Sequence, residues 1–130
     1  MASRVKLLGR TIERNPLRHY AGRIFATAAS LILDLPVYDT QCGAKLFRVN
    51  DRLKLVFNKP FTVKWIFDVE LLARLIITEK AGHPAVKDIC VEYPLHAWID
   101  KKGSKLRAMD FVTSIGDLLK VWGLMRARRW

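Results

Sequence analysis

Residues 38–47 read YDTQCGAKLF and form the most informative stretch of the chain. They place an acid, a glycine and a lysine within seven residues, between two apolar runs. A second acidic segment, WIFDVELL at residues 65–72, follows, and a Gly-Ser-Lys turn lies at residues 103–105. Two acidic segments followed by a loop of phosphate-binding size indicate transfer chemistry on phosphorylated compounds.

Composition predicts one small domain that spans residues 1–130. The chain has 130 residues, of which 51% are hydrophobic and 27% charged, so it can bury a core and is not expected to be disordered. Its 23 Lys and Arg residues against 12 Asp and Glu residues give a net charge of +11. This excess favours an anionic partner: a phosphate, a nucleic acid or an acidic membrane surface. Composition alone does not choose among the three.

Cysteine and histidine positions give no metal-site pattern. Cys42 and Cys90 lie far apart and are expected to be reduced thiols of a cytosolic protein. His19, His83 and His96 are scattered, so none is assigned to a metal. The start of the chain lacks the apolar region of a signal peptide, and no apolar run is long enough to span a membrane.

Three longer helices are expected from apolar periodicity. Residues 1–15 are polar and basic and are predicted to be irregular. A helix should begin at Asn15 and Pro16 and end near Asp34. Its apolar stripe is Leu17, Tyr20, Ala21, Ile24, Phe25, Ala28, Leu31 and Ile32. A second is expected over residues 66–80, closed by Gly82. Residues 110–130 are predicted to form an amphipathic helix with a basic end, whose stripe is Phe111, Ile115, Leu118, Leu119, Trp122 and Met125.

The remaining segments predict short strands and one short helix. Residues 45–49 read as a short strand, and Asn50 or Asp51 can cap a helix that runs to about Phe57. Residues 86–98 alternate enough to predict a strand interrupted by a proline. Helices and strands together predict the α/β class.

At YDTQCGAKLF, WIFDVELL and GSKL the sequence resembles the C-terminal half of a family 2 glycosyltransferase of the polyprenyl-phosphate type. The resemblance runs over residues 3–119 and includes Glu92-Tyr93-Pro94 before Trp98. It implies the C-terminal part of a GT-A-like fold, with helices packed on a small sheet. The N-terminal nucleotide-binding half with its D-x-D metal motif is expected to be absent, because Asp39-Thr40-Gln41 does not fit that motif. The chain is therefore expected to be an acceptor-side part that is inactive alone.

Three acids are catalytic candidates through this resemblance. It implies that Asp39 lies beside the reaction centre, that Asp68 is a candidate base and that Glu70 supports the site. The alternatives are a turn-capping Asp39 and a helix N-terminus built by Asp68 and Glu70. Residues two apart on a helix lie on nearly opposite faces, so both reach one site only if Asp68 lies at or before the first turn.

Phosphate or acceptor binding is predicted for seven residues. They are Arg4, Arg18, Arg23, Lys45, Gly103, Ser104 and Lys105. The glycine and serine would let backbone N–H groups face phosphate oxygens, and the cations would add charge. A solvated basic face and an ordinary polar turn are the alternatives. Gly43 is expected to allow a close backbone approach or a positive φ.

The resemblance implies sugar transfer from a nucleotide-sugar to a polyprenyl-phosphate acceptor. Mg²⁺ or Mn²⁺ is expected for the full-length family, but no motif of this chain should hold it. A phosphate acceptor is already ionised, so a base is less necessary than for a hydroxyl. The final helix suits peripheral contact with a membrane, which would place the protein in the cytoplasm at the inner membrane face.

Two other roles stay open at this stage. The charge motivates a basic domain that binds nucleic acid or an anionic membrane surface without catalysis. Nucleic acid is disfavoured, because the basic residues are spread out and no known recognition motif is present. An exposed apolar stripe would also allow self-association.

Overall fold

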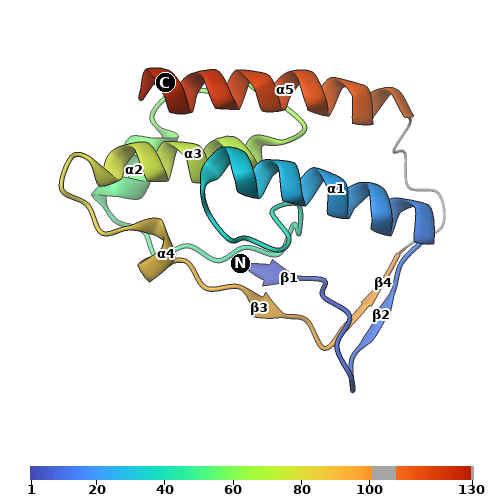
Figure 1. Ribbon diagram of the computed structural model, residues 1–130. Helices are drawn as coiled ribbons and strands as arrows, with labels where there is room; N and C mark the ends of the chain where they lie inside the picture. Colours follow the sequence, from blue (N-terminus) through green and yellow to red (C-terminus); the bar gives the residue numbers. More distant parts are fainter. Residues whose placement is uncertain (101–107, 130) are drawn as a thin grey trace.

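The computed structural model describes residues 1–100 and 108–129, and within them the chain is an α/β protein (Figure 1). The helices are α1 (Pro16–Leu33), α2 (Asp51–Phe57), α3 (Phe67–Glu79), α4 (Val86–Ile89) and α5 (Ala108–Ala127). The strands are β1 (Ala2–Ser3), β2 (Thr11–Glu13), β3 (Tyr93–Pro94) and β4 (Ala97–Ile99). The expected class, with helices and a small sheet component, is confirmed.

Helices α1, α3 and α5 pack on one another and enclose the core. Figure 1 shows α5 lying across α1 and α3, with the strands on the far side of α1. Fully buried residues from each of the three helices, Ala29, Ala73 and Val121, meet in the core cluster. Small side chains at these positions let the helix backbones approach closely. The helices therefore contribute most of the core, and no strand residue belongs to the core cluster in the described part of the chain.

Helix α1 has the bounds that its terminal residues predict. Pro16 is its first residue, and the carbonyl of Asn15 accepts a hydrogen bond of 2.9 Å from the backbone N–H of His19. After Leu33 the chain turns at Asp34, which has a φ of 49°, and the hydroxyl of Ser30 donates to the carbonyl of Leu35 at 2.6 Å. The local start and stop signals therefore decide this helix.

The buried face of α1 differs from the predicted stripe. Of that stripe, Phe25 enters the core, whereas Tyr20 and Leu31 are 69% and 77% exposed. Ala29 and Leu33, which lie outside the stripe, are buried. Apolar residues surround much of this helix, so periodicity alone does not fix the inward face. Packing against α3 and α5 makes that choice.

The predicted stripe of helix α5 is divided between core and surface. Leu118 is in the core and Met125 packs against it, whereas Ile115, Leu119 and Trp122 are largely exposed. No helix in the described part of the chain is both long and apolar enough to cross a membrane.

The expected helices after residue 50 are confirmed. The side chain of Asn50 caps α2 by accepting from the backbone N–H of Leu53 at 2.8 Å. Helix α3 begins one residue after Ile66 and is closed by a turn at Gly82, which has a φ of 87°. The buried Arg52 joins the two helices, because its guanidinium donates to the carbonyl of Leu75 at 2.7 Å.

The irregular lead-in expected over residues 1–15 is wrong. Strand β1 pairs in parallel with β3, and β2 pairs in parallel with β4. Each pair joins segments that lie more than 80 residues apart in the sequence, so no local pattern announces it. The strands are also only two or three residues long, which is too short for a periodicity signal.

Two further expectations of strand are corrected. Residues 45–49 have no strand in the structure, because no described segment pairs with them in a ladder. Residues 86–98 divide into α4, β3 and β4 instead of forming one strand. Gly43 has no positive φ, and a Cβ there would meet nothing within 4 Å, so the reason expected for a glycine is wrong.

Candidate functional site

Asp39 is held in a two-pronged ion pair with Arg4. The Nε and Nη2 atoms of Arg4 donate to the two carboxylate oxygens at 2.7 and 2.9 Å, and its backbone N–H adds a bond of 3.0 Å. Burial by itself would raise the pKa of Asp39, but the hydrogen bonds and charge of Arg4 outweigh it and the pKa lies below its ordinary value. Asp39 is therefore a carboxylate, and it fixes the Arg4 guanidinium in place.

Glu92 fixes the backbone on which Asp39 lies. Its two carboxylate oxygens accept from the backbone N–H groups of Tyr38 and Asp39, at 2.7 and 2.9 Å. The sequence marked Glu92 only as part of a motif, and its partners lie more than 50 residues away. A local pattern therefore could not have shown this role.

A second ion pair joins Lys45 to Asp68. The ammonium of Lys45 lies 2.9 Å from Oδ1 of Asp68, and both side chains are 8% exposed. The same ammonium also donates to the carbonyl of Cys42. Asp68 lies in the first turn of α3, as its predicted role required. Burial raises the pKa of Asp68 above its ordinary value, although Lys45 opposes the shift.

The two ion pairs lie in one neighbourhood. The negative charge of Asp39 contributes to the raised pKa of Asp68, which requires the two carboxyl groups to be near each other. Arg23 adjoins the same segment, because its guanidinium donates to the carbonyl of Tyr38 at 3.0 Å and stacks on the Tyr38 ring at 3.8 Å. The structure thus brings together three segments that the sequence singled out.

Arg14 belongs to this cluster, although the sequence gave no reason to select it. Its Nε is buried and has no hydrogen-bond partner among the described residues. Burial and then the nearby charge of Arg4 lower its pKa, while Asp39 opposes that shift. The hydroxyl of Thr40 and the amide nitrogen of Gln41 are also buried without a partner in this part of the chain. Both residues follow Asp39 in the sequence, and an unpaired buried donor is a group that an anionic ligand would stabilise.

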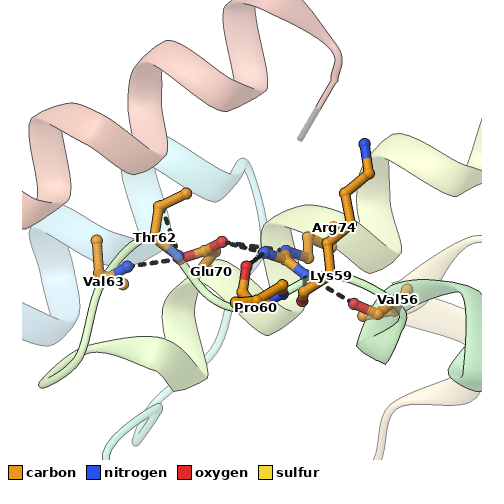
Figure 2. Close-up of polar contacts among 7 residues, drawn as sticks. All are labelled: Val56, Lys59, Pro60, Thr62, Val63, Glu70 and Arg74. Carbon is orange, nitrogen blue, oxygen red and sulfur yellow. Dashed lines mark hydrogen bonds and ion pairs between the residues drawn. The ribbon is translucent and has the colours of Figure 1, made fainter.

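Glu70 contacts Arg74 and the backbone of the segment before α3 (Figure 2), whereas Asp68 pairs with Lys45. One carboxylate oxygen accepts from the backbone N–H groups of Thr62 and Val63 at 2.8 and 3.0 Å, and the other accepts from Arg74 at 2.6 Å. The Arg74 guanidinium also donates to three backbone carbonyls of residues 56–60. Glu70 is fully buried, and with Arg74 it connects residues 56–63 to α3.

Four predicted positions lie outside what the structure describes. Gly103, Ser104 and Lys105 fall within residues 101–107, and the side chain of Arg18 is likewise not described. Trp65 is 49% exposed, and Trp98 is half-buried with the Arg4 guanidinium 5.2 Å from its ring centroid.

The carboxylates of this site do not fit a divalent metal. In residues 1–100 and 108–129, no group of three or more His, Cys, Asp or Glu residues is placed to hold one. Asp39 and Asp68 are each engaged by a basic side chain instead.

Fold and site together define an α/β chain with clustered acids and arginines suited to an anionic ligand. The chain is similar to three dolichyl-phosphate beta-glucosyltransferases of Trichomonas vaginalis. One is 32% identical over 94 residues, which cover 72% of this chain and 26% of that protein. The others are each 28% identical over 118 residues, which cover 91% of this chain and 33% or 32% of the relative.

The predicted resemblance to the polyprenyl-phosphate branch is confirmed: the chain is homologous to dolichyl-phosphate glucosyltransferases. It spans between a quarter and a third of the length of these relatives. No protein-family model matches the chain, and no solved structure matches it significantly.

Proposed function

We propose that this chain forms the acceptor-phosphate side of a glycosyl-transfer site, within a GT-A-like fold. The acceptor would be a dolichyl phosphate or a related polyprenyl phosphate, and the donor a nucleotide-sugar. One observation carries this proposal: the ion pairs Arg4–Asp39 and Lys45–Asp68 lie in one neighbourhood, and Arg14, whose Nε is buried without a partner among the described residues, lies near Arg4 and Asp39. The homology to dolichyl-phosphate glucosyltransferases supports the choice of acceptor.

In the proposed reaction, a phosphate oxygen of the acceptor attacks the anomeric carbon of the sugar. The bond from that carbon to the nucleoside diphosphate breaks, the diphosphate leaves with the electron pair, and the configuration inverts. A phosphate monoester has its second pKa at about 6, so the attacking oxygen is already ionised at neutral pH. No proton has to be removed from it.

The acids of the site are therefore positioning residues in this proposal. Asp39 orients Arg4, and Asp68 orients Lys45, so that the two cations face the acceptor phosphate together with Arg14. A fixed cation stabilises a developing charge more than a mobile one, because no reorganisation is needed during the reaction. Glu70 acts further back, by holding the segment before α3. The Mg²⁺ or Mn²⁺ expected from the resemblance would need ligands from other residues.

Calorimetry with farnesyl phosphate tests the phosphate site directly. The wild-type chain should bind it, and Arg14→Gln should weaken binding at least about tenfold, because one charge-assisted hydrogen bond is worth about 1.5–3 kcal/mol. Lys54→Gln is the matched control, since Lys54 is exposed and its loss changes the net charge equally. It should leave the affinity unchanged. The chain alone should transfer no glucose from a nucleotide-sugar.

Three results would contradict this function. The first is the absence of farnesyl phosphate binding, and the second is equal binding of farnesol, which lacks the phosphate. The third is equal weakening by Arg14→Gln and Lys54→Gln, which would show attraction by net charge only. Duplex DNA that binds more tightly than farnesyl phosphate, with a steep salt dependence, would instead favour the nucleic-acid role.

We also propose peripheral membrane contact through the outer face of α5. Ile115, Leu119 and Trp122 are exposed on this helix, and the Arg126 guanidinium lies 4.7 Å from the centroid of the Trp122 ring. An apolar stripe that ends in cations suits an anionic bilayer surface. Sedimentation with phosphatidylserine vesicles should capture the chain, and Leu119→Lys should abolish capture. Capture by phosphatidylcholine vesicles to the same extent would argue against the role of charge.

A further inference from the structure

Four phenylalanine rings form a connected row on the surface of the molecule. Phe47, Phe57, Phe61 and Phe67 meet edge to face in this order, with ring centroids 6.2, 5.6 and 5.8 Å apart. Phe47, Phe57 and Phe67 are each 40–47% exposed. Single exposed apolar residues are normal on a protein surface, but side chains that touch one another while facing solvent make a patch. We call these four rings the phenylalanine row.

Other large apolar side chains of the same segment, residues 46–67, are exposed as well. Each lies within two residues of a ring of the phenylalanine row, and they are Leu46, Val49, Leu55 and Trp65. An exposed apolar patch of this kind is typical of a surface that binds a partner or a membrane.

The middle of the row is fixed to the helical part of the fold. The guanidinium of Arg74 lies 4.4 Å from the centroid of the Phe61 ring. The same guanidinium donates to the carbonyls of Lys59 and Pro60. Glu70 accepts from the backbone N–H groups of the two residues that follow Phe61 (Figure 2). The segment is therefore held on both sides of Phe61, so binding through it costs little ordering entropy.

Basic side chains are interspersed with the apolar ones along residues 46–67. Arg48, Lys54, Lys59 and Lys64 are exposed. Asp51 is the only acid in the sequence of this segment, and it pairs with Lys54 at 3.0 Å. Four exposed cations against one acid leave an excess of three positive charges beside the rings. This combination suits an anionic bilayer, which presents hydrocarbon and negative headgroups together.

A basic pocket continues the positive charge from this segment to the end of α5. The pocket has a volume of about 290 Å³ and is lined by Leu55, Asn58, Lys59, Arg128 and Arg129. None of these five residues is an acid. Arg128 and Arg129 directly follow α5, so the pocket brings cations from two distant parts of the sequence together. The charge complementarity with an anionic surface therefore extends beyond the row itself.

We propose that the phenylalanine row and the cations beside it form a docking surface for an anionic phospholipid bilayer. The rings would enter the boundary between headgroups and acyl chains. Arg48, Lys59 and Lys64 would lie against the anionic headgroups, with their alkyl stems along the apolar patch. Charge complementarity selects this occupant over a neutral apolar partner. The surface consists of other residues than the outer face of α5, so either contact can exist without the other.

Docking at this surface would also bring the proposed acceptor-phosphate site to the bilayer, a consequence that rests on the proposed function. Lys45 directly precedes Leu46, and Asp68 directly follows Phe67. The two ends of the segment therefore carry the Lys45–Asp68 ion pair. An acceptor phosphate on a membrane lipid would meet the site within the headgroup layer.

Sedimentation with phosphatidylserine vesicles measures the docking. The wild-type chain should bind, and Phe57→Gln should weaken binding at least about tenfold, because one phenyl ring no longer enters the bilayer. Lys64→Gln should weaken binding about fivefold, because one cation near the anionic surface is lost. Tyr20→Gln is the matched control, since Tyr20 is an exposed aromatic side chain of α1 outside the row, and it should leave binding unchanged.

Tryptophan fluorescence with brominated phosphatidylserine locates the contact. Bromine on the acyl chains quenches rings that reach them, so quenching should fall in Trp65→Phe while this variant still binds vesicles. Trp122→Phe is the matched comparison, because Trp122 lies on the outer face of α5. Quenching that falls only in Trp122→Phe would assign the membrane contact to α5 and overturn the docking surface.

Other results would also contradict the proposal. Failure of the wild-type chain to bind phosphatidylserine vesicles, equal binding to phosphatidylcholine vesicles, or equal losses in Phe57→Gln and Tyr20→Gln would each overturn it. A dimer that Phe57→Gln dissociates, without vesicle binding, would assign the surface to a second copy instead. If Phe57→Gln fails to fold, Lys64→Gln and the quenching of Trp65 decide. Farnesyl phosphate binding without vesicles is a separate measurement, so the phosphate site and the docking surface can fail independently.

Discussion

At the scale of single residues, Asp39 and Asp68 show how similar burial leads to opposite pKa shifts. Both are buried carboxyl groups next to a cation. Arg4 meets Asp39 with three donors, which outweighs desolvation and lowers the pKa. Lys45 brings a single ammonium to Asp68, which does not offset burial, and the pKa rises. The donors aimed at each carboxylate and the neighbouring charges together decide the sign, since Arg14 also lowers the pKa of Asp39 and Asp39 also raises that of Asp68.

Asp39→Asn should destabilise the fold. Removing one member of a buried ion pair leaves the Arg4 charge without its partner, which costs about 3 kcal/mol. Urea unfolding of both proteins measures this cost. Asp51→Asn is the control, because Asp51 forms an exposed pair with Lys54 and should change the unfolding free energy little. Equal losses of unfolding free energy in the two variants would show that the buried Arg4–Asp39 pair matters no more than the exposed Lys54–Asp51 pair.

The contribution of Asp39 to stability should disappear in acid. Its pKa in the folded chain is below the ordinary value of 3.8, so folding favours the ionised form. The contribution is therefore complete above pH 3.8 and is lost as the pH falls through the lower folded value. The difference in unfolding free energy between the wild type and Asp39→Asn should shrink across that window. A difference that is constant with pH would contradict the lowered pKa.

Lys45→Met should raise the pKa of Asp68 further. The ammonium is the attraction that opposes desolvation, so its loss leaves the carboxyl buried beside a methyl thioether. Carbon-13 NMR titration of the Asp68 carboxyl measures the shift. Lys54→Met, at an exposed position, serves as the control and should leave this pKa where it is. An unchanged value in Lys45→Met would show that the ion pair is absent in solution.

At the scale of elements, buried arginines connect α3 to the segments around it. Arg74 donates to the carbonyls of Val56, Lys59 and Pro60 as well as to Glu70, which ties the end of α2 and the following turn to α3. Arg52 makes a similar connection from α2 to the other end of α3. These contacts satisfy backbone carbonyls that would otherwise be buried without a donor.

Arg74→Lys should loosen this connection although it keeps the charge. An ammonium lacks the planar fork that reaches three carbonyls and a carboxylate at once, so a loss of about 3 kcal/mol is expected. Urea unfolding measures the loss, and amide exchange at Thr62 and Val63 should accelerate as their acceptor Glu70 is freed. Arg48→Lys at an exposed position is the control. Wild-type stability in Arg74→Lys would refute the structural role of the fork.

At the scale of the whole molecule, the core joins three helices that are distant in the sequence. Ala29 of α1, Ala73 of α3 and Val121 of α5 are all fully buried in it. No residue of β1 to β4 belongs to this cluster among the described residues. The helices therefore provide most of the buried apolar core.

Leu33→Ala and Leu31→Ala compare the buried and the exposed face of α1. Leu33 is 1% exposed, so its truncation should leave a cavity that costs about 2–5 kcal/mol. Leu31 is 77% exposed and its truncation should have little effect. Thermal and urea unfolding give both values. A larger cost for Leu31→Ala would restore the face that the sequence predicted.

Sequence patterns were reliable where the cause is local. Asn15 with Pro16 and Asn50 each fix a helix start through their own backbone or side-chain chemistry, and both starts are confirmed. Asp39, Asp68 and Glu70 could also be selected from the sequence, because the motifs that contain them resemble those of a glycosyltransferase family. The inward faces of α1 and α5 could not, because apolar residues surround much of each helix and only packing chooses among them.

By itself, the sequence determined the α/β class, the helix boundaries and the segments that carry Asp39 and Asp68. Only the tertiary structure decided that Arg4, Arg14 and Glu92 join them, because these contacts link residues far apart in the chain. It also decided that residues 45–49 stay unpaired, although their composition favours a strand. A strand needs a neighbour to satisfy its backbone, and propensity cannot provide one.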